Sequence, residues 1–353
     1  MIFSRKKIDE ALNEFSQNVK PVSLYRDAWN RLKKNKMAMF GMVVVFIYFI
    51  VSLLAPVLPF YDYAEQEMMH INMPPSFKPA GEVMVRTREA YYSKLMAKEG
   101  RSQYTAAEKE ELDTMRREAE TNPKHKKIFI FGTDVLGRDL LARVIYGGRV
   151  SIGIGVAGTL AAMLFGTFYG AIAGFVGGKT DNIMMRIVDI VYSLPYLMLV
   201  IVMMALFGGK GIFHLFIAIV MISWLNLARV VRGQIMSLKN SEFIEAARSV
   251  GAGTGRIILK HLLPNVVGLV IVYSSLQLPT FIINEAFLSF LGLGVSAPMT
   301  SWGVLIDDGT SVMGLYPWLL VVPALTMSFF IFCMNFLGDG LRDAFDPQAK
   351  NRL

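Results

Sequence analysis

Six long apolar stretches dominate this sequence, and each is close to the roughly twenty residues that a helix needs to cross a bilayer. By residue number they cover 37–58, 150–176, 187–207, 212–231, 266–290 and 317–337. None of them alternates apolar and polar residues as the strands of a membrane β-barrel do. Of the 353 residues, 54% are hydrophobic and 18% are charged, which lies outside the usual range of soluble proteins. The sequence therefore predicts an all-α integral membrane protein with six transmembrane helices.

The basic residues are distributed unevenly between the segments that flank these stretches. The first 36 residues carry nine Lys and Arg against four acids, and residues 229–265, from the end of the fourth stretch to the start of the fifth, carry six against two. Because short segments rich in Lys and Arg stay in the cytoplasm, both termini are expected there, and residues 59–149 are expected outside. A polar, basic start of this length is typical of a cytoplasmic tail and not of a signal peptide. The net charge of +8 is thus a topology signal and does not predict nucleic-acid binding.

The predicted organisation has five parts. In chain order they are a cytoplasmic tail (1–36), a first transmembrane helix (37–58), an external, periplasmic loop (59–149), a core with transmembrane helices two to six (150–338) and a cytoplasmic C-terminal tail (339–353). Within the loop, residues 80–127 form a charged insert, in which Thr105 and Glu108 have the spacing of a capping box that opens a polar helix. Residues 131–149 combine turn glycines with an amphipathic pattern, so they are expected to lie along the membrane surface.

Two segments imitate nucleotide-binding loops. Residues 153–158 fit GxGxxG, but they lie inside an apolar stretch with no preceding soluble strand. The GKT sequence at 178–180 lacks the first glycine of a phosphate loop, because residue 173 is alanine. The single cysteine, Cys333, excludes an internal disulfide and a cysteine-based metal cluster. The chain is therefore expected to bind no cofactor and no metal, and any ATP hydrolysis must come from a partner.

Small residues and prolines inside the apolar stretches predict how the helices pack. Gly166, Gly170 and Gly174 recur every four residues, which places them on one helix face and lets another helix approach closely. Pro195 and Pro279 are each expected to kink a helix.

The segment 240–265 combines a short amphipathic helix with a return to the membrane. Phe243, Ala246, Ala247 and Val250 have the spacing of one apolar face, about two turns long. Gly251 then predicts a left-handed helix end, and Pro264 marks the start of the next span. Periodicity alone leaves two interpretations open: the face enters a groove of a partner protein, or it packs on its own bundle.

The same segment resembles a known signature. Glu245, Ala246 and Ala247, followed by Gly251 and then by Leu262 and Pro264, resemble the EAA signature of the permease subunits of bacterial ABC importers. Strict counting places His261 where that signature has isoleucine, and Leu262 stands in for it. The resemblance implies that these six residues couple the chain to an ATPase subunit through a coupling helix.

Further motifs resemble one branch of this family, the dipeptide, oligopeptide and nickel permeases of the C-subunit type. They are Gly132 to Asp134 with Arg138 and Asp139 before the second span, Asp181 to Asp189, Glu285 with residues 288–303, and Gly338 to Asp343 with Asp346 and Pro347. The resemblance implies a type I ABC importer permease fold in the bacterial cytoplasmic (inner) membrane. It also implies a heterodimer with a second permease, two ATP-binding subunits, and an external solute-binding protein that delivers peptides. The insert 80–127 departs from the family pattern.

The cargo and the pathway stay open at this stage. Nickel chelates and other small solutes are alternative cargoes within the family, and composition alone also allows an ATP-independent channel, a secondary transporter or a structural scaffold. Gln277, Asn284 and Glu285 are candidates for the pathway, because polar groups inside the membrane must face protein or water. For Glu285 the alternative is a hydrogen bond to the loop that follows it.

Overall fold

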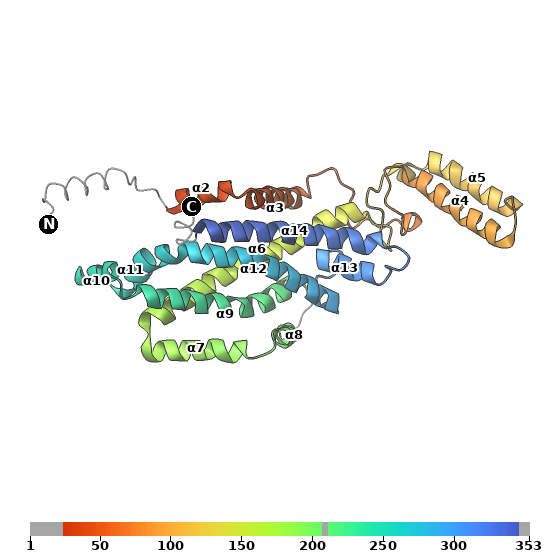
Figure 1. Cartoon of the computed structure of the whole chain (residues 1–353). Helices are drawn as coiled ribbons and strands as arrows, with labels where there is room; N and C mark the ends of the chain where they lie inside the picture. Colours follow the sequence, from red (N-terminus) through yellow and green to blue (C-terminus); the bar gives the residue numbers. More distant parts are fainter. Residues whose placement is uncertain (1–23, 207–210, 346–353) are drawn as a thin grey trace, which may run out of the picture.

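The computed structural model describes residues 24–206 and 211–345, and all of the named elements in these ranges are helices. Figure 1 shows a long bundle of nearly parallel helices with a separate helical hairpin at one end. Five helices are long and apolar enough to cross a membrane. They are α3 (Lys36–Leu54), α6 (Leu140–Val176), α9 (Ile212–Leu238), α12 (Leu263–Leu288) and α14 (Trp318–Phe345). They match five of the six predicted stretches, and α12 runs on through Pro279 to Leu288 without interruption.

The third predicted stretch, 187–207, is not one helix. It is divided between α7 (Gly178–Tyr192) and α8 (Tyr196–Leu206), whose axes are bent by 92°. The break lies directly before Pro195, which has no N–H to donate and disfavours the helical conformation at the preceding residue. If the bent pair counts as one span, the chain has six spans, as predicted.

The glycines of α6 let α9 approach closely, as predicted. A Cβ atom on Gly166 would lie 2.8 Å from the backbone oxygen of Trp224, and one on Gly174 would lie 2.7 Å from that of Arg232. Between them, Gly170 meets the backbone oxygen of Ala228. Both sets recur every four residues, so one glycine row of α6 lies against one carbonyl row of α9.

One end of the bundle is more ordered than the predicted tails suggest. The helix α2 (Leu24–Lys34) lies within the predicted N-terminal tail, where its buried side chains Ala28 and Leu32 pack against the end of α14. The helix α14 itself continues to Phe345, seven residues into the predicted C-terminal tail, because Gly340 and Ala344 are buried in this contact. The motif residues Asp346 and Pro347 lie outside the described residues.

The same end carries the segment between α9 and α12. It consists of α10 (Glu242–Ser249), α11 (Thr254–Ile257) and the wider π-helical turn η3 (Ile258–Leu262), and Figure 1 shows α10 and α11 close to the far end of α9.

The opposite end carries the charged insert. The helices α4 (Ala80–Glu99) and α5 (Ala106–Thr121) form an antiparallel hairpin, with the predicted capping box of Thr105 and Glu108 present at the start of α5 (Figure 1). Two short turns, η1 (Met68–His70) and η2 (Pro123–Lys126), connect the hairpin to the bundle.

The expectation that residues 131–149 lie along the membrane surface is wrong for their second half. Residues 140–149 are the first ten residues of α6, and Leu140, Arg143 and Gly147 among them are buried. Their amphipathic pattern reflects contact with α13 (Trp302–Thr310), a short helix beside η4 (Ser289–Leu293), and not contact with lipid.

Candidate functional site

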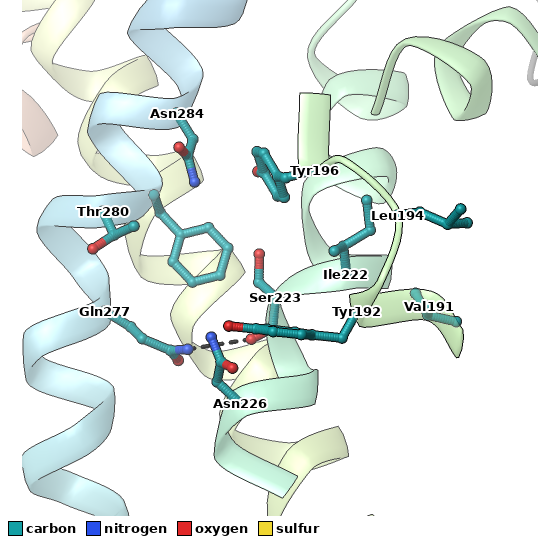
Figure 2. A pocket seen from close by; sticks show the side chains of 11 residues that line it. Val191, Tyr192, Leu194, Tyr196, Ile222, Ser223, Asn226, Gln277, Thr280 and Asn284 are labelled. Atoms are coloured by element: carbon teal, nitrogen blue, oxygen red, sulfur yellow. Dashed lines mark hydrogen bonds between the residues drawn. The ribbon is translucent and has the colours of Figure 1, made fainter. Parts of the chain in front are cut away.

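A cavity of about 460 Å³ lies where α7 and α8 break, between them, α9 and α12 (Figure 2). Its apolar lining consists of Val191, Leu194, Ile222 and Phe281, and its polar lining consists of Tyr192, Tyr196, Ser223, Asn226, Gln277, Thr280 and Asn284. The structure therefore brings together two of the three predicted pathway residues, Gln277 and Asn284. Among the residues that the structure describes, the lining has carboxamides, hydroxyls and aromatic rings but no charged side chain.

Only part of this polar lining is internally hydrogen-bonded. Gln277 Nε2 donates to the backbone oxygen of Ser223 at 3.2 Å, which joins α12 to α9. The other side-chain atom of this carboxamide, Gln277 Oε1, is buried without a hydrogen-bond partner. The Tyr196 hydroxyl lies near Ser223 and Asn284 and is likewise buried without a hydrogen bond of standard geometry.

The Tyr192 ring lies across one side of the cavity, next to Asn226 (Figure 2). Arg229, one turn further along α9, lies over this ring at 4.2 Å from its centroid and pairs with Asp189 at 2.8 Å. A second ion pair, between Asp181 and Arg232, also links α7 to α9. The first half of the broken span is thus held against α9 on the α10 side of the cavity.

The third pathway candidate, Glu285, does not line this cavity. Its side chain is fully buried and accepts hydrogen bonds from Ser151 in α6 at 2.9 Å and from Ser289 in η4 at 2.8 Å. The bond to Ser289 is the alternative that the sequence left open, a contact with the segment that follows Glu285.

The motif before the second span forms a buried ion-pair cluster. Asp134 pairs with Arg138 at 2.7 Å and with Arg143 at 2.5 Å, and Arg143 also reaches Asp308 of α13 at 3.4 Å. Asp139 accepts the backbone N–H groups of residues 141 and 142, so it is the N-cap of α6. These residues fix the start of α6 and its contact with α13.

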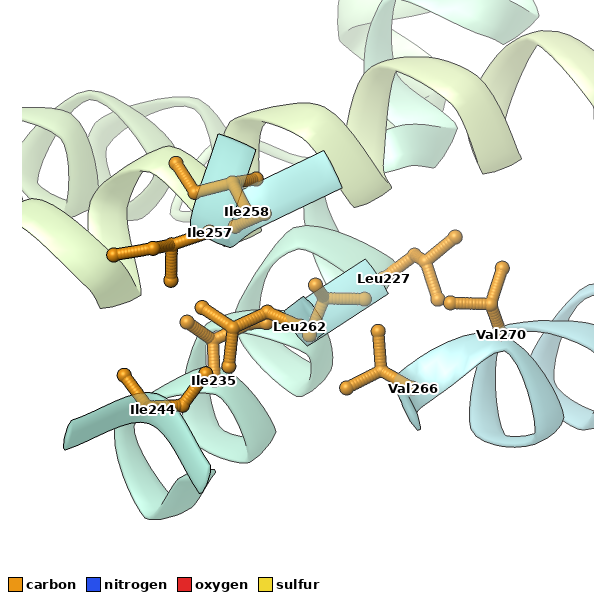
Figure 3. Close-up of a cluster of buried hydrophobic side chains, with 10 residues drawn as sticks. Leu227, Ile235, Ile244, Ile257, Ile258, Leu262, Val266 and Val270 are labelled. Atoms are coloured by element: carbon orange, nitrogen blue, oxygen red, sulfur yellow. The ribbon is translucent and has the colours of Figure 1, made fainter. Parts of the chain in front are cut away.

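The helix α10 has one side chain that packs on its own bundle. Ile244 is fully buried, in a cluster with Ile235 of α9, Leu262 of η3 and Val266 of α12 (Figure 3). The apolar face predicted from the sequence points elsewhere: Phe243 is 40% exposed and Val250 is 89% exposed.

Two further residues of the predicted face, Ala246 and Ala247, are exposed and half-buried, respectively. Glu245 is also exposed, and among the described residues it forms no ion pair, either with Arg248 or with another side chain. Arg248 instead lies over the ring of Phe175 at 5.5 Å.

The predicted end of this helix is confirmed. Gly251 has φ of +84°, its N–H donates to the backbone oxygen of Arg248, and the N–H of Ala252 donates to that of Ala247. These two bonds are the Schellman pattern of a helix end. The π-helical turn η3 ends two residues before Pro264. Proline has no N–H, so a regular α-helix would have a gap in its hydrogen-bond ladder at this point.

Sequence reasoning missed several members of the site. Tyr192, Tyr196 and Asn226 were not candidates, although Asn226 is a polar residue inside an apolar stretch and met the criterion that selected Gln277. Ile244 was missed because it lies off the apolar face. Within residues 24–206 and 211–345, no cluster of three or more His, Cys, Asp or Glu side chains is arranged to hold a metal ion.

A helical bundle with five candidate spans, a broken sixth and a polar cavity at that break has the architecture of a multi-pass membrane protein. Residues 166–351 match the family of binding-protein-dependent transport system inner membrane components, and residues 23–75 match the N-terminal TM domain of oligopeptide transport permease C. The chain belongs to this family of inner-membrane permeases.

Curated relatives match over most of their length. The oligopeptide transport system permease protein OppC of Escherichia coli K12 is 39% identical over 98% of this chain and 99% of its own. That of Haemophilus influenzae is 54% identical over 65% of this chain and 73% of its own. The dipeptide transport system permease protein DppC of Bacillus subtilis is 37% identical over 97% of this chain and 92% of its own. Among solved structures, a chain of the MetNI methionine ABC transporter is 18% identical, with a TM-score of 0.47 over 57% of this chain and 95% of its own.

Proposed function

We propose that this chain is a permease subunit of an ATP-driven importer, and that it forms, with a second permease, the pathway for di- and oligopeptides. An external binding protein delivers the peptide, and two ATPase subunits supply the energy. The names of the relatives, which are oligopeptide and dipeptide permeases, support this cargo. The cavity lining also favours peptide over a nickel chelate, because it offers carboxamides and hydroxyls and no imidazole, thiolate or carboxylate.

The observation that carries the proposal is the position of α10. One of its faces is exposed, and another packs against the helices that line the cavity. Its exposed apolar face, with Phe243, Ala246 and Val250, is available to a partner. Its buried side chain, Ile244, packs with residues of α9 and α12, the two helices that supply the Ser223 and Gln277 sides of the cavity. A partner that moves α10 therefore moves the cavity walls, which is the coupling that alternating access requires.

This role assigns the orientation of the bundle. The end with α2, α10 and the last turns of α14 faces the cytoplasm, where the ATPases are, and the α4–α5 hairpin faces the outside. A cysteine at Ser102, between α4 and α5, tests this when Cys333 is also replaced. An impermeant thiol reagent is expected to label it in intact spheroplasts, whereas labelling only after lysis would reverse the orientation.

Reconstitution tests the function itself. The chain, its partner permease, the ATPases and the binding protein in proteoliposomes are expected to accumulate radiolabelled trialanine only when ATP is present. Ala246→Trp should abolish ATPase retention while leaving the membrane abundance of the permease unchanged, because Ala246 is exposed in this chain. Uptake that does not need ATP, or full retention of the ATPases by this variant, would contradict the proposal.

A further inference from the structure

The polar groups around the cavity at the break between α7 and α8 match the groups of a peptide bond. Three carboxamides line it, those of Asn226, Gln277 and Asn284. Each offers an amide oxygen as acceptor and N–H groups as donors, as a peptide backbone does. A charged side chain of a cargo would find no opposite charge in this lining. The uncharged amide chain is the part of a peptide that such a surface can recognise.

Two unpaired atoms indicate where a ligand binds. Neither Gln277 Oε1 nor the Tyr196 hydroxyl forms a hydrogen bond of standard geometry, although both atoms are buried. An unpaired buried polar group is unfavourable, so a ligand that supplies its partner gains the corresponding free energy. The terminal torsion of a glutamine is soft, so the carboxamide can rotate to turn Oε1 toward the cavity, and this rotation exchanges the Nε2 bond to Ser223 for a bond to the ligand.

The spacing along α12 fits a short extended peptide. Gln277, Thr280 and Asn284 follow each other at i, i+3 and i+7, so they share one face of the helix (Figure 2). Seven residues of α-helix rise by about 10.5 Å, which is the length of roughly three extended residues. The cavity volume of about 460 Å³ is within the range of small-ligand sites.

We propose that Gln277, Tyr196 and Asn284 bind the backbone of the transported peptide. Gln277 Oε1 accepts a peptide N–H, the Tyr196 hydroxyl donates to a peptide carbonyl, and Asn284 binds the next amide toward the hairpin end of the bundle. The cavity then binds the peptide backbone and does not discriminate between peptides by the charge of their side chains. This assignment rests on the proposed function and adds to it the chemical group that the permease recognises.

A double-substitution cycle tests the Gln277 contact in the reconstituted importer. The two changes are Gln277→Leu in the permease and N-methylation of the amide nitrogen of the central residue in trialanine, and the readout is the initial rate of ATP-dependent uptake per assembled complex. Each change alone is expected to lower uptake about three- to ten-fold, the equivalent of one hydrogen bond. Both together should lower it no further, because they remove the same bond. Any effect of N-methylation on the binding protein is the same for both permeases and cancels in the comparison.

A second cycle tests the Tyr196 contact with a variant that keeps the aromatic ring. Tyr196→Phe removes only the hydroxyl, and a thioamide in the peptide weakens the carbonyl acceptor that this hydroxyl would bind. Both changes together should therefore lower the uptake rate no more than either change alone. Ser275→Ala is the matched control on α12, because the Ser275 hydroxyl donates to Val272 of its own helix, and it should leave uptake unchanged.

The outcomes separate this inference from the proposed function. If the wild-type complex takes up no trialanine with ATP, the proposed function is wrong and this inference with it. If uptake is normal but the paired changes multiply, only the backbone contact is wrong. Gln277→Leu should also lower the uptake of tripeptides with a central glutamate or a central lysine by the same factor. If Gln277→Leu changes the ratio of the two uptake rates, for the glutamate and the lysine tripeptide, the site distinguishes the charge of the peptide's side chain.

Discussion

The carboxylate of Glu285 in α12 accepts a hydrogen bond from the hydroxyl of Ser151 in α6, 134 positions earlier in the chain. The same hydroxyl oxygen accepts the backbone N–H of Trp302 at the start of α13, at 3.2 Å. Glu285 therefore joins α6, α12 and α13, on a different side of α12 from the cavity that Gln277 and Asn284 line.

This arrangement predicts a stability role for Glu285. Glu285→Gln keeps an acceptor oxygen and should leave uptake per assembled complex unchanged. Glu285→Leu leaves the hydroxyl protons of Ser151 and Ser289 without an acceptor in a buried place, which should cost about 1–3 kcal/mol, measured as a lower Tm of the purified complex. A Glu285→Gln variant with normal Tm and no uptake would instead place Glu285 in the pathway.

The helical period explains which pathway candidates the structure brings together. At 100° per residue, Asn284 lies about 20° from Gln277 around α12, whereas Glu285 lies about 80° away. The sequence thus contained a reason to separate Glu285 from the other two. It contained no comparable signal for Tyr192 and Tyr196, which reach the cavity only because the chain turns between them.

The contact between α6 and α9 gives a matched pair of glycine substitutions. Gly170→Ala places a methyl group against the backbone oxygen of Ala228, and helix backbones cannot move apart at one position alone, so the variant should lose about 1–3 kcal/mol. Gly153 in the same helix faces open space, and Gly153→Ala should be neutral or slightly stabilising. Equal Tm values for the two variants would argue against tight packing at Gly170.

The break of the third span could be predicted only in part. Pro195 predicts a kink, but it does not determine an angle of 92°. The position of α7 also depends on its ion pairs with α9, Asp189 with Arg229 and Asp181 with Arg232. Those partners are 40 and 51 residues apart in sequence, and no local pattern connects them.

Gly251 and Gly253 provide a test of the helix end after α10. Neither has an atom near the position of a Cβ, but φ is +84° at Gly251 and −70° at Gly253. Gly251→Ala should therefore cost about 1–2 kcal/mol and shift α10, which lowers ATPase retention on the purified permease. Gly253→Ala should retain the ATPases normally. Identical retention by both variants would show that coupling to the ATPases does not depend on the left-handed end of α10.

The cluster around Asp134 predicts a large effect of a single substitution. Asp134→Ala leaves Arg138 and Arg143 buried without their shared carboxylate, which should cost about 3–5 kcal/mol. Asp113→Ala removes the exposed partner of Arg116 and should cost less than about 1 kcal/mol. Thermal unfolding of the two purified variants measures the difference, and a small effect at Asp134 would mean that water reaches this cluster.

A buried histidine pair predicts that the hairpin end of the bundle loosens in acid. His70 in η1 and His125 in η2 are both buried, with Nε2 of the first 2.9 Å from Nδ1 of the second. Burial lowers the pKa of His70 from its ordinary 6.5 to about 4, and the neighbouring His125 is the second cause of the lowering. Lys127 and Lys124 lower this pKa further, whereas Glu67 raises it.

The sign of the effect follows from the lowered value. Between about pH 6.5 and pH 4 the unfolded segment binds a proton that the folded one does not, so stability decreases as the pH falls through this window, by up to about 3 kcal/mol. Hydrogen exchange of residues 68–127 should accelerate between pH 7 and pH 5, once corrected for the intrinsic pH dependence of exchange, while that of α6 should not. His70→Phe keeps a ring beside Phe129 and should remove this difference. His214→Phe, in α9, should preserve it, and a pH response that survives His70→Phe would assign the effect to other groups.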